Sequence, residues 1–389
     1  MIYSNLRDAD GQRMGLRCED GLIAEIGPHL ADAPGVAGEG RLLLPALVEP
    51  HCHLDKTLWG EPWQQGPGAQ TLRGWIENER RVLSACKTPV AVRAGRLMEQ
   101  MLISGTTAIR SHVDVAPDMG LSHVEAMLEL KQAWAPRIDL QLVAFPQQGV
   151  ISRPGTLDLL REAMTLGVET IGGLDPAGID GDPDGQLRGI FDLAQRFDRG
   201  VDIHLHDKGA LGAWQIRRIA DYTEASGLAG RVMISHAYCL GMISESELTA
   251  IGERLASLKI SLMTSAPGDV AVPPVARLTE LGVTVCCGSD GIRDAWSPLG
   301  NGDMLERAYL TAFRFDWSGD AEFALALSCA TSRAATAIGL SNRGLKVGAV
   351  ADFMMVDALN IGDALARRPQ RRRVVRHGRL IADDGRLVH

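Results

Sequence analysis

Short apolar runs recur along the chain, and each gives way to polar residues at its C-terminal end. Eight such runs lie around residues 43–54 and at 106–115, 139–147, 169–176, 200–207, 231–237, 259–267 and 283–290. The stretches between them, such as 124–134 and 211–226, show the apolar spacing of helices. Strands that alternate with helices indicate βαβ units and a parallel sheet. Eight units predict an α/β fold, a closed (β/α)8 TIM-like barrel.

The two ends of the chain follow a different pattern. Residues 1–45 and 345–389 contain short strand-like pieces separated by glycine turns, with little helical periodicity. Two end segments of the same kind predict one small β-sandwich domain built from both termini. We therefore expect a small domain formed by residues 1–45 and 341–389, and a barrel formed by residues 46–340.

Polar side chains that can bind a ligand follow nearly every predicted barrel strand. They are His51, His53, His112, Asp114, Gln147, Asp175, His204, Asp207, His236, Ser265 and Asp290. The C-terminal ends of barrel strands converge on one mouth, where active sites lie. The pattern therefore predicts a functional site at that mouth.

A metal centre is the chemistry that this pattern favours. His51 and His53 lie two residues apart at a strand end, so their side chains share one face. Alone, this spacing is equally typical of two polar residues that end a strand. The barrel would add His204 and Asp290, and three imidazoles with one carboxylate suit zinc, or else iron or manganese. Such an ion lowers the pKa of a bound water, which His236 would hold or deprotonate.

Composition narrows the class of partner. The 389 residues include 23% charged and 46% hydrophobic residues, which is typical of a globular protein. The net charge of −8 argues against a nucleic-acid partner, which needs a basic surface. No apolar run reaches the ~18 residues of a membrane span, and the polar N-terminus does not resemble a signal peptide. Seven scattered cysteines without a C-x-x-C pair fit reduced thiols, so we expect a cytoplasmic protein.

The ligand pattern resembles that of the amidohydrolase superfamily, and within it the cytosine deaminase-like branch. The resemblance rests on VEPHCHLDKT, IRSHVDV, LQLVAFPQQGV, VDIHLHD, ISHA and CCGSDGIRDAWSPLG, and it extends over nearly the whole chain. The H-x-H-x-D-K form at residues 51–56 also resembles the branch that removes N-alkylamines from triazine rings.

The resemblance implies a role for each matching residue. The metal ligands would be His51, His53, His204 and Asp290, while His236 and Asp290 would orient and deprotonate the attacking water. Gln147 would bond a ring carbonyl or amide of the substrate, and Trp296 would pack on the substrate pocket. Relatives are commonly homo-oligomers, so we expect one here.

Three positions depart from the cytosine deaminase pattern or add to it. Asp207 stands where those enzymes have the glutamate that protonates the substrate ring, and we expect it to act as the proton donor. Because aspartate is shorter by one methylene, the substrate ring would then lie differently; otherwise another group donates the proton. Gly291 stands where they have a second aspartate. Lys56 would face a substrate oxygen or a developing negative charge; alternatively, it is a surface lysine paired with Asp55.

Four further residues near the predicted mouth allow two interpretations each. His206 and His112 would support the metal ligands, since a metal-bound histidine usually donates its second N–H to a neighbouring group. Alternatively, His206 is itself a metal ligand, and His112 is an interior histidine with satisfied hydrogen bonds. Trp59 and Trp63 would form a lid over a flat heterocycle, or simply pack their loop on the barrel.

The sequence therefore predicts a metal-dependent deaminase or aminohydrolase that acts on a C–N bond of a small nitrogen heterocycle resembling cytosine, an aminopyrimidine or a triazine. The alternative is a cyclic amide hydrolase of the hydantoinase or lactamase type. Those enzymes usually carry a carboxylated lysine after the fourth barrel strand, where this chain reads GGLDPAG. A catalytically silent metal-binding scaffold is the third hypothesis.

Overall fold

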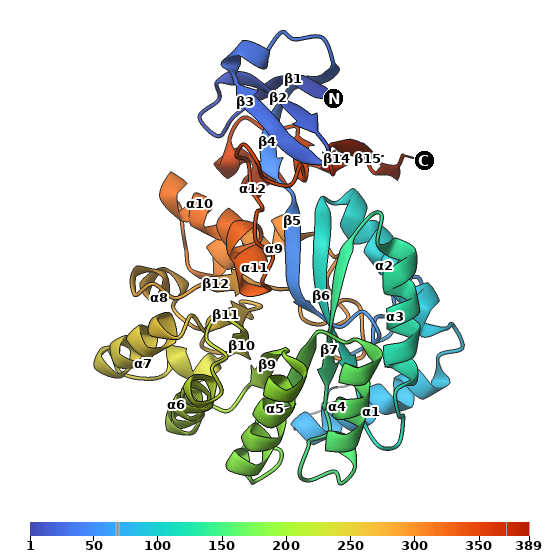
Figure 1. Cartoon of the computed structure of the whole chain (residues 1–389), viewed down its shortest axis with the longest axis vertical. Coiled ribbons are helices and arrows are strands. Elements are labelled where there is room, and N and C mark those ends of the chain that lie inside the picture. The colour runs from blue at the N-terminus through green and yellow to red at the C-terminus, as the bar shows by residue number, and fades with distance from the viewer. Residues whose placement is uncertain (67, 69–70, 371, 389) are drawn as a thin grey trace.

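The computed structural model describes residues 1–66, 68, 71–370 and 372–388, which form a barrel and a small β domain (Figure 1). The barrel sheet has eight parallel strands, ordered as they occur in the chain. They are β5 (Leu47–Cys52), β6 (Thr106–Asp114), β7 (Asp139–Phe145), β8 (Thr170–Leu174), β9 (Gly200–Leu205), β10 (Val232–His236), β11 (Ser261–Thr264) and β12 (Val285–Cys287). Each strand falls within one of the eight predicted runs, which confirms the (β/α)8 barrel.

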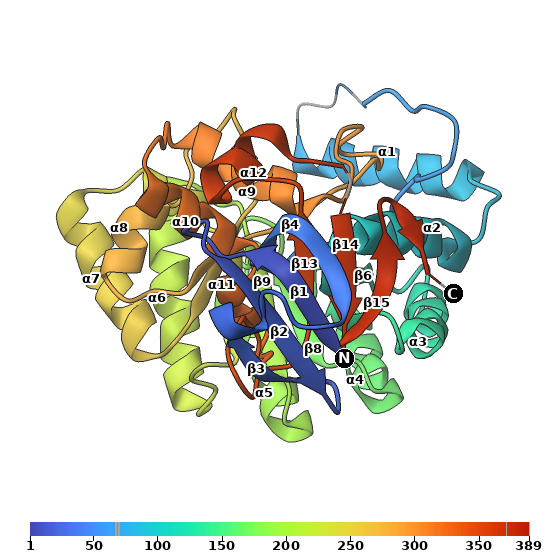
Figure 2. The same ribbon diagram turned by 90° about the horizontal axis from the view of Figure 1, so that it is seen from above.

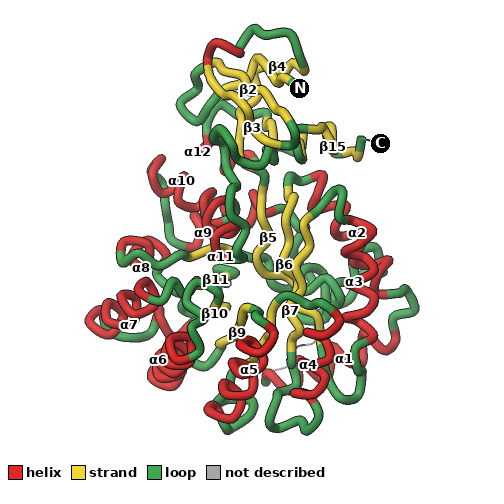
Figure 3. The backbone as a smooth tube through the Cα atoms, viewed as in Figure 1, coloured by secondary structure: helices red, strands yellow, loops and turns green. Residues whose placement is uncertain are grey.

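Helices surround the barrel strands (Figure 3). They are α1 (Leu72–Ala85), α2 (Val90–Ile103), α3 (Ser122–Trp134), α4 (Thr156–Leu166), α5 (Pro183–Phe197), α6 (Gly209–Ala225), η2 (Tyr238–Gly241), α7 (Glu245–Ser257), α8 (Val275–Glu280), α9 (Met304–Arg314), α10 (Asp320–Cys329) and α11 (Ser332–Ala337). The helices predicted at 124–134 and 211–226 are α3 and α6, which confirms both. Side-chain caps fix several starts: Asp182 accepts from the Gly185 amide at α5, and Ser244 accepts from the Glu247 amide at α7.

The barrel closes at the predicted metal motif. Cys52 at the end of β5 forms a parallel bridge with Asp290, three residues beyond β12. The Asp290 amide donates to the carbonyl of His51 at 2.9 Å. Two predicted metal ligands from opposite ends of the barrel sequence are therefore held side by side by backbone hydrogen bonds.

Strands from both ends of the chain form the small domain, as predicted. Its sheet has the order β16-β15-β14-β13-β4-β1-β2-β3. The strands are β1 (Ile2–Arg7), β2 (Arg13–Glu19), β3 (Leu22–Gly27), β4 (Val36–Pro45), β13 (Phe353–Val356), β14 (Arg372–Arg376), β15 (Arg379–Asp383) and β16 (Arg386–Leu387), with the short helices η1 (Pro28–Leu30) and α12 (Ile361–Arg367). Figure 2 shows these strands in front of the barrel when the molecule is seen from above. The expected domain boundaries at 45/46 and 340/341 stay a prediction.

The core follows the alternation of side chains along the strands. Cys286 belongs to a small inner cluster with Val48, Met233 and Met263, which packs against α11. The next residue, Cys287, belongs to the large core between the strands and the outer helices. All seven cysteines are free thiols. The helices that the structure describes include none with the length and apolarity needed to cross a membrane.

A buried ion pair joins the two domains. Arg372 on β14 is 1% exposed and binds both carboxylate oxygens of Asp303, each at 2.7 Å. Asp303 also caps α9 by accepting from the Leu305 amide at 2.9 Å. The guanidinium donates in addition to the carbonyl of Ser104 at 2.5 Å. The small domain is thereby fixed to the segment that follows Asp290.

We expect Arg372→Ala to lower the free energy of unfolding by about 3–5 kcal/mol, because Asp303 would stay buried without its partner. Urea unfolding followed by circular dichroism measures the change. Arg379→Ala, which removes an exposed arginine of β15, is the matched control and should change the free energy by less than about 0.5 kcal/mol. Equal effects of the two substitutions would contradict the role given to the ion pair.

Candidate metal centre and substrate cavity

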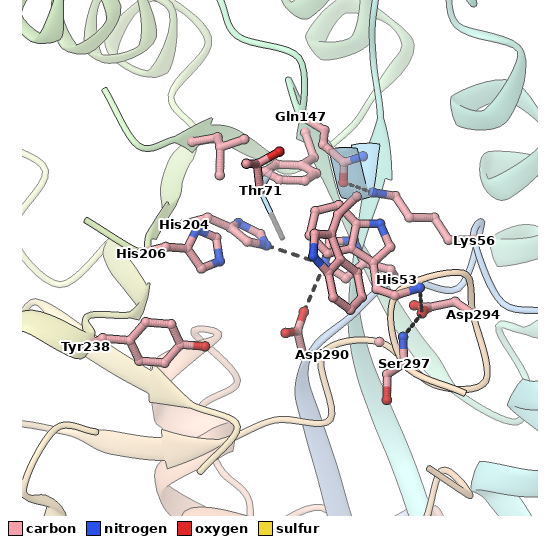
Figure 4. A pocket seen from close by; sticks show the side chains of 15 residues that line it. His53, Lys56, Thr71, Gln147, His204, His206, Tyr238, Asp290, Asp294 and Ser297 are labelled. Carbon is pink, nitrogen blue, oxygen red and sulfur yellow. Dashed lines mark hydrogen bonds and ion pairs between the residues drawn. The ribbon is translucent and has the colours of Figure 1, made fainter. Parts of the chain in front are cut away.

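Five side chains that can bind a metal meet at the C-terminal ends of the barrel strands. They are His51 and His53 at the end of β5, His204 on β9, His236 on β10 and Asp290 after β12. Nε2 of His53 lies 3.3 Å from Oδ1 of Asp290 and 3.4 Å from Nε2 of His204. Figure 4 shows these three side chains pointing toward one another. Nε2 of His51 lies 3.6 Å from the same Asp290 oxygen. The structure brings the predicted ligands together.

The cluster fits a divalent metal ion. His51, His204, His236 and Asp290 each offer a ligand atom, and these atoms lie within 4.8 Å of one another. A second set replaces His236 and Asp290 by His53 and His112. Nε2 of His51 and Nε2 of His236 are buried without a hydrogen-bond partner among the described residues. Buried polar atoms without partners are rare in native proteins, and a shared cation would satisfy them with the imidazole and carboxylate ligands that zinc accepts.

A hydrogen-bond chain behind His51 sets the orientation of its ring. Ser235 Oγ donates to Oδ1 of the buried Asp202 at 2.8 Å. The same hydroxyl oxygen therefore accepts from Nδ1 of His51, which lies 2.9 Å away. With its proton on Nδ1, the ring directs the lone pair of Nε2 to the cluster. Metal-bound histidines are usually oriented in this way, by donating their other N–H to a neighbouring group.

Burial favours the protonation states that metal binding requires. It lowers the pKa of His53 to about 4 and that of His112 to about 3, with further lowering by neighbouring positive charge. The pKa of His204 also falls well below its usual range because the ring is buried. Burial alone would raise the pKa of Asp290, but the histidines that face its carboxylate hold it well below the usual range. Neutral imidazoles beside an ionised carboxylate are the forms that bind metal.

The backbone is strained where the chain leaves β10 and β12. His236 has φ 71° and Asp290 has φ 61°, which are left-handed conformations that non-glycine residues rarely adopt. Asp175, after β8, has φ 32°. Such strain clusters at functional sites, where surrounding structure holds it in place.

A cavity of about 420 Å³ lies over the cluster. It is lined by His53, Lys56, Thr71, Trp75, Phe145, Gln147, Leu174, His204, His206, Tyr238, Asp290, Gly291, Asp294, Trp296 and Ser297. Phe145 stacks on His204 with ring centroids 4.1 Å apart, and Trp75 faces Trp296 at 5.6 Å. Aromatic walls with a few polar groups are typical of small-molecule sites. The predicted site residues Lys56, Gln147 and Trp296 all lie here.

Lys56 is buried in a charged network on one wall of this cavity. Its ammonium lies 2.9 Å from Asp114 and 3.5 Å from Glu79, and it donates to Oε1 of Gln147. Burial alone would lower the pKa of Lys56, but the carboxylates of Asp114 and Glu79 outweigh burial and raise it. Burial raises the pKa of Glu79 to about 7 and that of Asp114 to about 6. Of the two interpretations of Lys56, the structure excludes the surface lysine, and the partners are Asp114 and Glu79 rather than Asp55.

The structure does not bring Asp207 to the cavity, contrary to expectation. Its Oδ2 accepts from the Gly178 amide at 3.0 Å and from Nε2 of Gln215 at 2.8 Å. Asp207 is absent from the described residues that line the cavity, whereas His206 is present. Asp207 lies two residues beyond the end of β9, and these two donors hold its carboxylate. The geometry therefore does not support Asp207 as the proton donor.

His206, the neighbour of Asp207 in the chain, lines the cavity. Its Nδ1 lies 2.8 Å from Oδ2 of Asp175, and its ring stacks on His236 with centroids 4.4 Å apart. Burial alone would lower the pKa of His206, but the Asp175 carboxylate outweighs burial and raises it. His206 is therefore more than a support for His204: it presents an oriented imidazole to the cavity.

Trp59 and Trp63 do not form the expected lid. Arg293 lies over both rings, 5.7 Å from Trp59 and 5.6 Å from Trp63, and neither ring belongs to the described lining of the cavity. Trp63 remains 63% exposed. These rings bind an arginine of the neighbouring loop, so packing of the loop is the interpretation that the structure supports. The cavity tryptophans are Trp75 and Trp296.

Gly291 has a structural reason to lack a side chain. A Cβ at this position would lie 2.5 Å from Oδ2 of Asp294. Asp294 is buried, and it accepts from the amides of Trp296 at 2.8 Å and Ser297 at 2.7 Å. Burial raises its pKa to about 7. The carboxyl group of Asp294 thus organises the loop that carries Trp296. A side chain at residue 291 would occupy the space that this carboxyl group needs.

Ser235, Asp202 and Glu79 were not among the predicted site residues. Asp202 lies two residues before His204 on the same strand, so strand alternation was a sufficient signal for its inward face. Ser235 carries a weaker signal, because it directly precedes His236. Glu79 lies on α1, outside the strand-end pattern, and the sequence offers no signal for it.

Comparisons with known proteins agree with this geometry. The model of the Amidohydrolase family matches residues 36–382. N-isopropylammelide isopropyl amidohydrolase of Pseudomonas sp. (strain ADP) is 30% identical over 364 residues, 91% of this chain and 89% of that protein. The crystal structure of N-isopropylammelide isopropylaminohydrolase from Burkholderia multivorans ATCC 17616 has a TM-score of 0.95 at 41% identity, covering 100% of this chain and 99% of that one. That of 5-methylcytosine deaminase from Klebsiella pneumoniae, liganded with 5-fluorocytosine, has a TM-score of 0.88 at 29% identity, covering 100% and 98%.

We expect Ser235→Ala to weaken zinc binding about 10- to 100-fold, because His51 would lose the partner that fixes its proton on Nδ1. Competition between the protein and a chromophoric chelator measures the affinity. Ser261→Ala on β11 is the matched control, since Ser261 is also a buried strand serine. An unchanged affinity in Ser235→Ala would show that the hydrogen bonds from Asp202 through Ser235 to His51 do not contribute to metal binding.

Proposed function

This chain belongs to the amidohydrolase family and is a hydrolase of C–N bonds other than peptide bonds; we propose that it removes ammonia or an alkylamine from a small nitrogen heterocycle. The observation that carries the proposal is the close approach of His51, His53, His204 and Asp290, three of which, His53, His204 and Asp290, line a cavity with aromatic walls. The similarity to an N-isopropylammelide isopropylaminohydrolase supports a triazine-like ring. Similarity to 5-methylcytosine deaminase supports an aminopyrimidine as the next candidate.

We propose that these four residues hold one divalent ion, zinc in the first place, with iron or manganese as alternatives. When bound, the ion supplies Lewis acidity and lowers the pKa of water at the site. His236 and Asp290 orient that water and accept its proton. The oxygen of the water forms a bond to the ring carbon, and the bond from this carbon to the exocyclic nitrogen breaks.

His206 delivers the proton that the leaving nitrogen needs. The imidazole lines the cavity, and Asp175 binds Nδ1, so Nε2 is the atom that faces the substrate. Lys56 and Gln147 bind ring oxygens or ring nitrogens from the opposite wall, while Trp296 covers one face of the ring. The sum of these steps converts the amine and water into a hydroxylated ring and a free amine.

The alternative is a cyclic amide hydrolase. Strand β8 ends in Gly172, Gly173 and Leu174 and is followed by Asp175, so the lysine that usually bridges two metals is missing there. A metal content near one ion per chain supports the aminohydrolase. Two ions per chain would favour the alternative.

We expect His204→Ala and Asp290→Asn each to abolish amine or ammonia release, because each removes a ligand of the proposed ion. The measurement is a release assay over alkylaminotriazines, aminopyrimidines, pterins and creatinine-like rings, with the metal content determined in the same samples. His29→Ala, which removes an exposed histidine of the small domain, is the control and should retain full activity. Full activity in either ligand variant would overturn the proposal.

Separate substitutions of the neighbouring residues His206 and Asp207 test which of them is the proton donor. We expect His206→Asn to lower kcat about 10²- to 10⁴-fold, the usual contribution of a positioned acid. Asp207→Asn should lower kcat far less, because its carboxylate is bonded to Gly178 and Gln215 rather than facing the cavity. Steady-state kinetics on the best substrate of the screen decides. The reverse order of the two effects would restore Asp207 as the donor.

A further inference from the structure

Helix α1 contributes to the cavity, and side-chain contacts such as those of Asn78 with Ala295 and Arg80 with Asp118 attach it to the rest of the molecule. It lies between β5 and α2 in the chain, and Figure 2 shows it at the periphery of the molecule. Trp75 of α1 and its N-cap residue Thr71 line the cavity. Within the described part of the chain, no other helix or strand packs its backbone closely against α1. Its position therefore depends on side chains.

Glu79 supplies the central attachment of α1. The side chain is 1% exposed, although it is charged and lies on a peripheral helix. One carboxylate oxygen accepts from Nε2 of Gln147 at 2.7 Å, and the other accepts from Nε1 of Trp296. Lys56 lies 3.5 Å from the second oxygen. All three partners of Glu79 line the cavity.

The same contacts determine which way the Gln147 amide points. Its Oε1 accepts from the Lys56 ammonium, which has no acceptor atom. Its Nε2 donates to Glu79. If the amide were flipped, the NH₂ group would face the ammonium and two donors would oppose each other. The network therefore leaves one N–H and one oxygen lone pair of Gln147, in fixed positions, for a ligand.

We propose that Glu79 is a positioning residue that fastens α1 over the cavity and fixes the orientation of the Gln147 amide. The second part rests on the proposed function, because the amide then decides which ring substituents are accepted. A ring whose oxo and amino groups match the fixed amide binds well. A ring with the two groups exchanged leaves buried donors or acceptors unpaired, which is how polar sites reject a close analogue.

The experiment compares Glu79→Gln with Glu77→Gln. Both substitutions replace a carboxyl group of α1 by an amide of the same size, but Glu77 is exposed. For each variant, kcat/KM is measured on two alkylaminotriazines that differ by exchange of an oxo for an amino group at one ring carbon. Hydrogen exchange of residues 74–85 is followed by mass spectrometry on the same proteins.

In Glu79→Gln, discrimination between the two rings should fall about ten- to a hundredfold, the cost of one unpaired buried group, and exchange in α1 should accelerate. Glu77→Gln should change neither. An equal loss of kcat/KM on both rings, or unchanged exchange in α1, would overturn the proposal. If Glu79→Gln does not fold, Glu79→Asp, which keeps the charge but retracts the carboxylate, is measured instead.

These outcomes separate this inference from the proposed function. If the wild-type protein releases no amine from any heterocycle, the proposed function fails. The exchange rates of α1 in the two variants then decide alone whether Glu79 fastens the helix.

Discussion

Everything in this site depends on keeping several imidazole nitrogens buried, neutral and directed at one point. Burial in a barrel mouth removes the water that would otherwise satisfy them, and Nε2 of His51 and Nε2 of His236 have no hydrogen-bond partner among the described residues. A protein group that holds the other nitrogen of a ring can direct the free one. His51 shows how this is done, because Ser235 and Asp202 fix its proton on the side away from the cluster. Barrel closure contributes as well, since the hydrogen bond between the His51 carbonyl and the Asp290 amide sets the spacing of two ligands.

The opposite wall of the cavity works by a different principle. There, the buried ammonium of Lys56 lies between the carboxyl groups of Asp114 and Glu79, so opposite charges are paired out of contact with water. Buried ion pairs of this kind contribute little net stability, but this one fixes where donors and acceptors lie on the wall. In the proposed function, the histidine cluster would provide the reactivity, and the charged wall would select among substrates.

Strand polarity explains what was predictable from the sequence. The parallel strands all deliver their C-terminal residues to one mouth, so His51, His53, His204, His236 and Asp290 were identifiable without coordinates. Alternation continued past β9 to His206 but not to Asp207, whose carboxylate the Gly178 amide and Gln215 hold away from the cavity. Glu79 was beyond prediction, because helical periodicity does not specify which residue of α1 reaches a side chain 68 positions along the chain.

The pairing of β4 with β13 has a consequence for how the chain is made. Pro45 of β4 lies opposite Phe353 of β13. Strand β4, which leads into the barrel, therefore gains this neighbour only after all eight barrel strands have been synthesised. At ribosomal rates of roughly 5–20 residues per second, the free edge of β4 waits on the order of tens of seconds for its partner. During synthesis the N-terminal strands are therefore an unfinished sheet, with an exposed edge that other chains can join. Strand β13 protects the edge of β4 only after the barrel strands have been made, and termination before β13 would release a barrel with an open edge of this kind.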